Sequence, residues 1–91
     1  MDFEWDESKN EANIRKHKID FEDIPSVFDS VLVVSPDNRM DYGEHRWIGL
    51  GLLGQVVVLI VFSEPKPRII RIISARKANR KERKYFYGEI V

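Results

Sequence analysis

The chain has 91 residues, of which 43% are hydrophobic, so it can form one domain with a single core. It contains no cysteine, which excludes disulfides, thiolate metal sites and cysteine nucleophiles. No window approaches the ~20 apolar residues of a membrane span, and the acidic start, Met1-Asp2-Phe3-Glu4, is unlike a signal peptide. We therefore expect a single domain, residues 1–91, in the cytoplasm, with no membrane partner.

The formal net charge is zero, but acids and bases are unevenly distributed. Residues 1–44 carry twelve acids and five bases, a sum of −7, whereas residues 45–91 carry ten bases and three acids, a sum of +7. Folding could pair the two halves internally, or it could leave a functional basic face exposed. Composition alone does not decide between these two possibilities.

The first third of the chain predicts a short strand and two helices. Residues 3–5 alternate apolar and acidic side chains, which is enough for a short strand. Asp6 is a candidate N-cap for a mostly solvated helix over residues 7–16. Asp20 is the candidate cap of a second helix, which has an apolar stripe within residues 24–28.

The middle of the chain predicts a sheet. Residues 31–34 form an apolar run, and residues 46–53 and 55–62 flank Gly54, which can supply the positive φ of a tight hairpin. The run before Phe62 is apolar on both alternating faces, so it should be a central strand with cover on both sides. With a further strand from Arg68 and short links, we expect an α+β fold: an antiparallel meander of about four strands, two N-terminal helices and one C-terminal helix.

The stretch from Lys66 to Lys84 contains nine of the fifteen basic residues and a single carboxylate, Glu82. Its first half is rich in isoleucine and reads as a strand. Asn79 and Glu82 have the spacing of a capping box, so a helix should begin near Arg80, and Gly88 should end it. Cations should therefore gather at a strand-to-helix corner without acidic partners: Arg76, Lys77, Arg80 and Arg83. An anion is the expected counterpart, and a polyphosphate chain is the commonest extended one.

Other chemistries have weaker signals. His17 and His45 are far apart in the chain, and neither has a second ligand at helical spacing, so no metal site is expected. Ser74 lies in the basic strand without the G-x-S-x-G motif. Gly49-x-Gly51-x-x-Gly54 has the spacing of a dinucleotide fingerprint, but a valine-rich strand follows it rather than a helix.

Cleavage of RNA suits a basic corner, because the ribose 2′-OH is already a nucleophile. The protein must hold the backbone in line, neutralise charge on the phosphate and move two protons. Arg76, Arg80 and Arg83 are candidates for the charge, since arginine stays protonated and binds phosphate oxygens bidentately. The candidate acids and bases are His17, Glu44 and Tyr85.

Each of these residues has a structural alternative. His17 could only interact with the C-terminus of the first helix, and Glu44 could simply pair with a neighbouring arginine. Tyr85 could pack against the core or the surface. Arg71, which interrupts four isoleucines, could form an ion pair with an acid from the N-terminal half.

Several stretches together resemble the BrnT family of toxins from bacterial type II toxin–antitoxin systems. The resemblance spans nearly the whole chain and rests on these residues: Phe3-Glu4-Trp5-Asp6, Lys9, Asn13, Lys16-His17, Phe21-Glu22-Asp23, Val27-Phe28-Asp29, Gly43-Glu44-x-Arg46, Arg71-Ile72-Ile73-Ser74-Ala75-Arg76 and Glu82-Arg83-x-Tyr85. One position departs from the family, which often has Gly where this chain has Lys18. Lys18 must then accept a left-handed conformation or end the helix differently.

The resemblance implies a ribonuclease toxin with a compact fold similar to the RelE-type toxins, acting without metal or other cofactor. It also implies a BrnA-type antitoxin with a ribbon-helix-helix DNA-binding part, so that operator DNA is bound only through the antitoxin. The catalytic residues expected from the residues and the resemblance together are Arg76, Arg80, His17, Glu44 and Tyr85. The expected RNA-binding residues are Arg71, Lys77, Arg83 and Lys16.

Two functions from different classes follow. The first is a metal-independent endoribonuclease that cleaves RNA through the 2′-OH, arrests growth and is neutralised by its antitoxin. The second is a non-catalytic module whose basic face holds an acidic partner protein or a nucleic acid. The second predicts equal affinity for RNA and a 2′-deoxy analogue, a steep salt dependence and no cleavage products.

Overall fold

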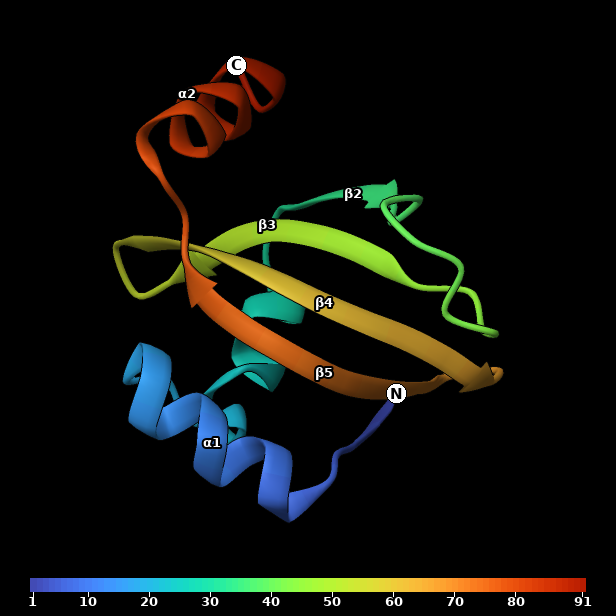
Figure 1. Cartoon of the computed structure of the whole chain (residues 1–91). Coiled ribbons are helices and arrows are strands. Elements are labelled where there is room, and N and C mark those ends of the chain that lie inside the picture. The colour runs from blue at the N-terminus through green and yellow to red at the C-terminus, as the bar shows by residue number, and fades with distance from the viewer.

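A five-stranded sheet separates two layers of helix (Figure 1). The computed structural model describes residues 1–91, with the strands in the order β1-β5-β4-β3-β2. Helix α1 lies below the sheet and α2 lies above one end of it. The elements are β1 (Asp2–Glu4), α1 (Glu7–His17), the 3-10 helices η1 (Phe21–Asp23) and η2 (Pro25–Asp29), β2 (Leu32–Pro36), β3 (Trp47–Leu53), β4 (Val56–Lys66), β5 (Ile69–Lys77) and α2 (Arg80–Glu89). No helix is both long and apolar enough to span a membrane.

The α+β class and the antiparallel meander of β2 to β5 are confirmed, but the sheet has a fifth strand. Strand β1 pairs in parallel with β5, with Glu4 opposite Arg71. The sheet is therefore mixed, because the chain returns to β5 only after passing through all the other elements. The expected count of four strands is wrong, and a RelE-type fold does not describe this arrangement in detail.

The expected second N-terminal helix is also wrong, because two short 3-10 helices replace it. Asp20 does cap the first of them, accepting from the N–H of Glu22. Pro25 has no N–H to donate to the carbonyl of Phe21, so an α-helix cannot continue through this point. The backbone instead closes one tight turn from Ile24 N–H to Phe21 O at 3.1 Å and then begins another at Pro25.

Two further boundaries differ from expectation at the C-terminal side. Strand β4 continues past Phe62 to Lys66, so it is longer than the run of residues 55–62 that the sequence predicts. Helix α2 begins at Arg80 behind the predicted capping box, but it passes Gly88 and ends at Glu89. The N–H of Ile90 closes the last turn on Phe86 O at 3.3 Å, so Gly88 has no role as a terminator.

Strand β4 is central, as its apolar pattern predicts, and each of its faces contacts a separate core cluster. Its Val58 and Ile60 pack under the sheet with Phe21, whereas Leu59 packs above the sheet with Phe86 of α2. We call the upper surface the α2 face. Helix α2 covers only one end of it, so the rest of this face is available to other side chains.

Glycines in β3 serve packing rather than nucleotide binding. A Cβ on Gly51 would lie 2.6 Å from Val27 Cγ1, so the strand can approach η2 only because no side chain intervenes. Gly54 adopts φ +61° in the hairpin between β3 and β4, as predicted. The dinucleotide spacing is therefore coincidental, as the sequence indicates.

Asparagine side chains fix α1 against the sheet edge. Beyond its pairing with β1, strand β5 has a free edge, and the Asn13 amide occupies it. Asn13 Nδ2 donates to Ala75 O at 2.9 Å, and Ala75 N donates to Asn13 Oδ1 at 3.1 Å. A side chain here replaces the backbone of a neighbouring strand, which satisfies buried polar groups on both partners. We call these two hydrogen bonds between Asn13 and Ala75 the Asn13 clamp, and they fix the C-terminal part of α1 against β5.

Candidate nucleic-acid interface

A β-bulge places two arginines of β5 on the same face of the sheet. Val61 pairs with Ser74 and Phe62 pairs with Ile72, so Ile73 is an extra residue in the ladder. In a regular strand Arg71 and Arg76 would lie on opposite faces, because side chains alternate. The bulge changes this, since Arg71 now pairs with Ser63 and Arg76 with Leu59, which face the same way. Both guanidinium groups therefore belong to the α2 face.

Arg76 is held by the cap of α2. Its Nη1 and Nη2 donate to the two carboxylate oxygens of Glu82 at 2.8 and 2.9 Å. Glu82 also accepts from the N–H of Asn79 at 2.8 Å, which completes the predicted capping box. The bidentate contact lowers the pKa of Glu82 and raises that of Arg76. The expectation that the corner cations have no acidic partner is thus wrong for Arg76.

The other predicted cations of the corner have no carboxylate partner. Arg83 donates from Nη1 to Ala78 O at 2.9 Å, and its remaining N–H groups make no ion pair. Arg80, Lys77 and Lys16 are exposed and form no ion pair. Tyr85 on α2 is also 55% exposed, so it lies at the surface rather than in the core. Around Arg76, which is held by Glu82, exposed cationic side chains therefore remain available to an external anion.

His17 is the last residue of α1, and it lies close enough to the corner for the charge of Arg76 to act on it. It lines a cleft of about 230 Å³ together with Lys16, Ile73 and Ser74. Burial lowers the pKa of His17, and the positive charges of Lys16 and then Arg76 lower it further. These effects favour the neutral imidazole, the form that can accept a proton. Lys18, which follows it, ends the helix with φ +61°, so of the two expected alternatives it adopts the left-handed conformation.

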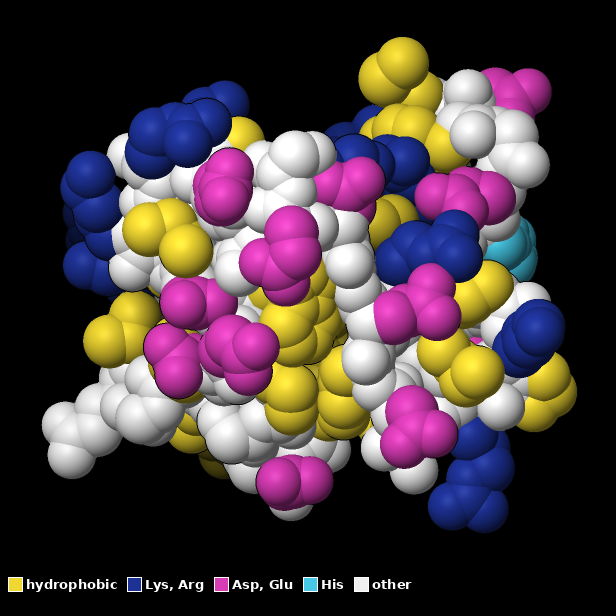
Figure 2. Space-filling view, turned by 90° about the horizontal axis from the view of Figure 1, so that it is seen from below, with side chains coloured by type: hydrophobic (Ala, Val, Ile, Leu, Met, Phe, Trp, Pro, Cys, Tyr) yellow, Lys and Arg dark blue, Asp and Glu magenta, His cyan; other side chains and the backbone are white.

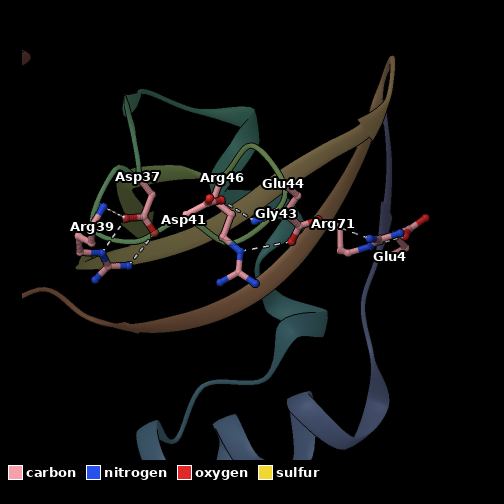
Figure 3. A network of polar contacts seen from close by, with 8 residues as sticks. All are labelled: Glu4, Asp37, Arg39, Asp41, Gly43, Glu44, Arg46 and Arg71. Atoms are coloured by element: carbon pink, nitrogen blue, oxygen red, sulfur yellow. Dashed lines mark hydrogen bonds and ion pairs between the residues drawn. The ribbon is translucent and has the colours of Figure 1, made fainter.

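A second group of charges lies near the other end of β5. Glu44 Oε1 is 3.3 Å from Arg46 Nε, and Glu44 Oε2 is 3.9 Å from Arg71 Nη1. Arg71 also donates from Nε to Glu4 Oε2 at 2.8 Å. Figure 3 shows Glu44 between the two arginines, with Glu4 on the other side of Arg71. We call Glu4, Arg71, Glu44 and Arg46 the carboxylate bridge. The sequence left open that Glu44 pairs with a neighbouring arginine and that Arg71 pairs with an acid from the N-terminal half. The structure contains both kinds of ion pair.

Three site residues were not among the predicted ones: Asp37, Arg39 and Arg46. Arg39 donates to both carboxylate oxygens of Asp37, at 2.7 and 2.8 Å, and this pair lowers the pKa of the buried Asp37 to about 2. The charge of Arg39 also acts on the corner: it adds to the lowering of the pKa of Glu82, and it partly opposes the rise in the pKa of Arg76. The only sequence signal is the short Asp37-x-Arg39 spacing, and nothing in it shows that the charge of Arg39 acts on Arg76 and Glu82.

The acidic half of the chain does not neutralise the basic corner. Figure 2 views the molecule from the side of α1, and many acidic side chains spread across this face. Of the five ion pairs, only those of Arg46 and Arg71 join the two halves of the chain. Pairing between the halves therefore accounts for the carboxylate bridge, and most cations of the corner stay uncompensated.

Comparisons with known proteins agree with the resemblance seen in the sequence. A family model described as "Ribonuclease toxin, BrnT, of type II toxin-antitoxin system" matches residues 5–82. The crystal structure of the Brucella abortus ribonuclease toxin BrnT superposes with a TM-score of 0.73 at 29% identity, covering 88% of this chain and 99% of that one. The comparison with curated proteins gives no match. The chain therefore belongs to the BrnT family of ribonuclease toxins of type II toxin–antitoxin systems.

Proposed function

We propose that this protein is a cytoplasmic, metal-independent endoribonuclease whose reaction takes place at the corner between β5 and α2. The observation that carries the proposal is the arrangement around Arg76. His17, whose pKa the charge of Arg76 helps to lower, belongs to this arrangement, and so do the cations of α2 that form no ion pair. Such a site has a proton acceptor and fixed positive charge within one short stretch of surface.

The reaction that suits these groups is attack of the ribose 2′-OH on its own phosphate. His17 removes the 2′ proton as the new O–P bond forms, and Arg76 and Arg80 stabilise the charge that grows on the phosphate oxygens. The bond to the 5′ oxygen then breaks, and Tyr85 is the candidate donor of the proton that this leaving group needs. The products are a 2′,3′-cyclic phosphate and a free 5′-OH. Flanking phosphates would bind the remaining cations: Lys16, Lys77, Arg83 and Arg71.

Glu44 has a different position from the other predicted catalytic residues. Its carboxylate contacts Arg46 and Arg71, away from the contact between Arg76 and Glu82. We therefore prefer His17 as the general base and keep Glu44 in the site as a charged neighbour of the RNA path.

A BrnA-type antitoxin is the proposed partner. An acidic or amphipathic segment that becomes ordered on binding would neutralise a basic corner most simply. We propose that this segment covers Arg76 and Arg80, and that a ribbon-helix-helix part of the antitoxin carries the contact with operator DNA. A structure of the complex in which both arginines stay fully open to solvent would contradict this proposal.

The activity is tested with the purified chain and a short RNA, with and without EDTA. We expect cleavage in both conditions, because no step requires a metal. Arg80→Ala should lower the rate on the order of 10²–10³ if Arg80 contacts the reacting phosphate. Lys81→Ala is the matched control, since it removes the same charge from the adjacent exposed position of α2. An intact protein that gives no products above a buffer blank would end the nuclease proposal.

The non-catalytic binding module remains the second candidate, because one observation favours it. Arg76 already has both of its terminal nitrogens on Glu82 and so has less capacity for a reacting phosphate. This candidate predicts equal affinity for RNA and its 2′-deoxy analogue, with no products from either. The cleavage assay above separates the two.

A further inference from the structure

A buried hydroxyl without a hydrogen-bond partner lies beneath the carboxylate bridge. Ser63 is 3% exposed, and its Oγ makes no hydrogen bond. It pairs with Arg71 in the sheet, and it faces away from Phe62, which belongs to the core below. Ser63 is therefore on the α2 face, beside Arg71. Buried polar groups of this kind usually have a partner, so the orphan hydroxyl indicates a ligand.

Two arginines flank this hydroxyl, and each is fixed from its outer side. Arg46 directly precedes Trp47, which pairs with Phe62, so Arg46 lies on the same face as Ser63. The Arg46 guanidinium is 4.0 Å from the centre of the Tyr42 ring, which stacks against it. Arg71 is held by the 2.8 Å contact with Glu4. Both guanidinium groups are thus prepositioned around the same point.

Glu44 occupies this point, but it is held loosely. Its contacts with Arg46 and Arg71 are 3.3 and 3.9 Å long, and its side chain is 35% exposed. A carboxylate at these distances interacts weakly with each arginine. A phosphodiester carries the same charge, and its two non-bridging oxygens suit the donor fork of arginine.

We propose that Arg46, Arg71 and Ser63 form a subsite for one phosphate of the RNA chain, which the Glu44 carboxylate occupies in the free protein. When RNA binds, the phosphate displaces Glu44, accepts from both guanidinium groups and receives the Ser63 hydroxyl as a third donor. This inference rests on the proposed function, since it names where the substrate backbone binds away from the reacting bond. It also gives Glu44 a role as a competing internal anion rather than a base.

The test measures affinity for an all-2′-deoxy hexanucleotide by fluorescence anisotropy, because this probe binds but cannot be cleaved through the 2′-OH. Glu44→Gln removes the competing charge and should tighten binding by about two- to fivefold, because the exposed ion pair that competes with the phosphate is worth at most about 1 kcal/mol. Glu22→Gln is the control, since it removes the same charge from an exposed site without an ion pair. Equal affinities for the two variants would overturn the subsite.

Substitutions in the subsite itself should act in the opposite direction. Arg46→Gln or Arg71→Gln should weaken binding and lower the slope of log K against log salt by about 0.7, the value for one phosphate contact on a single strand. Ser63→Ala should weaken binding several-fold without lowering the thermal midpoint, because removing a buried hydroxyl that has no partner in the free protein costs the fold no hydrogen bond. A fall in the midpoint with unchanged affinity would show that Ser63 is only structural.

Competition with inorganic phosphate shows whether the subsite binds a phosphate of RNA or free phosphate. Cleavage assays then separate the subsite from the proposed nuclease function. If the subsite binds RNA, millimolar phosphate should displace the hexanucleotide only weakly; displacement at micromolar phosphate would show a site for free phosphate instead. If the protein cleaves RNA but Glu44→Gln and Glu22→Gln bind alike, the nuclease proposal stands and the subsite is wrong. If Glu44→Gln tightens binding without any cleavage, the subsite is supported and the nuclease proposal fails.

Discussion

The two charged regions of the α2 face are built in opposite ways. At the corner, Arg76 contacts Glu82, six residues away in the chain, and the contact is bidentate and partly buried. In the carboxylate bridge, Arg71 contacts Glu4, 67 residues away, with both side chains about 45% exposed. The ion pair at the corner is therefore local and held in a fixed geometry, whereas the carboxylate bridge joins distant segments through contacts that solvent weakens.

This difference indicates which region can change when a ligand binds. Removing Glu82 from Arg76 would also break the cap of α2, because the same carboxylate serves both. Removing Glu44 from its arginines would break only two loose contacts. We infer that the corner holds its geometry through the reaction, while the bridge exchanges its partner.

The largest expected effect is on the cleavage rate, and it comes from replacing the histidine at the corner rather than the one beside the carboxylate bridge. His17→Gln should lower the cleavage rate by on the order of 10²–10⁴, the usual contribution of a general base. His45→Gln is the control, because His45 lies in the loop beside the bridge and contacts the Trp47 ring edge to face, with ring centres 5.1 Å apart. Equal losses in the two variants would mean that catalysis does not belong to the corner.

The pH dependence of cleavage adds a second measurement on His17. Its pKa is lowered from the ordinary 6.5 by burial and by neighbouring positive charges, so the imidazole is neutral above a folded pKa that lies below 6.5. The rate should therefore rise with pH through a value below 6.5 and level off above it. In His17→Gln the residual rate should lose this acidic limb. A limb above pH 6.5 would contradict His17 as the base.

The next effect compares the stability of the two regions. Glu82→Gln weakens both the cap and the contact with Arg76, and we expect a loss of about 1–3 kcal/mol in the free energy of unfolding. Glu4→Gln removes an exposed ion pair and should cost about 0–1 kcal/mol. Urea denaturation of both variants gives the values. A larger loss for Glu4→Gln would reverse the assignment of the rigid and the exchangeable region.

Features that depend on neighbouring residues were predictable, and features that depend on the path of the chain were not. The capping box of Asn79 and Glu82 and the turn at Gly54 follow from local chemistry and are confirmed, and Lys18 adopts the left-handed one of its two expected alternatives. The parallel pairing of β1 with β5 has no local signal, because its partners are separated by most of the chain. The break at Pro25 was readable in principle, since a proline that lacks the N–H needed by Phe21 stops an α-helix.

In the candidate site, too, the local features were predictable and the tertiary contacts were not. Its cations were predictable as a group, because nine bases lie in one stretch with one acid. Their partners were not, since the bulge at Ile73 moves Arg71 and Arg76 to one face and the loop brings Arg39 within electrostatic reach of Arg76. Composition shows which charges exist, and tertiary structure decides which of them remain unpaired.

A smaller effect concerns the loop that supplies the bridge. Arg39 lowers the pKa of Asp37 to about 2, so this pair stabilises the fold above the unfolded pKa near 3.8 and is lost as the pH falls toward 2. We expect about 1–2 kcal/mol from it, because the Arg39 side chain is 56% exposed. Unfolding of Asp37→Asn between pH 5 and pH 2 should therefore depend less on pH than that of the control Asp29→Asn, which removes an exposed carboxylate without an ion pair.

The smallest effect tests how firmly the end of α1, and so His17, is fixed. Lys18 holds φ +61° at the cost of backbone strain that glycine would not have. Lys18→Gly should stabilise the fold by about 0.5–1 kcal/mol, reduced slightly by loss of the 3.1 Å contact between Lys18 Nζ and Arg15 O. Lys16→Gly is the control, because Lys16 is within the helix and its replacement should destabilise the fold by a similar amount.

The same variant tests what positions His17. If the Asn13 clamp positions His17, cleavage by Lys18→Gly should stay close to that of the wild type. A large loss of rate would show instead that the left-handed residue itself orients the imidazole.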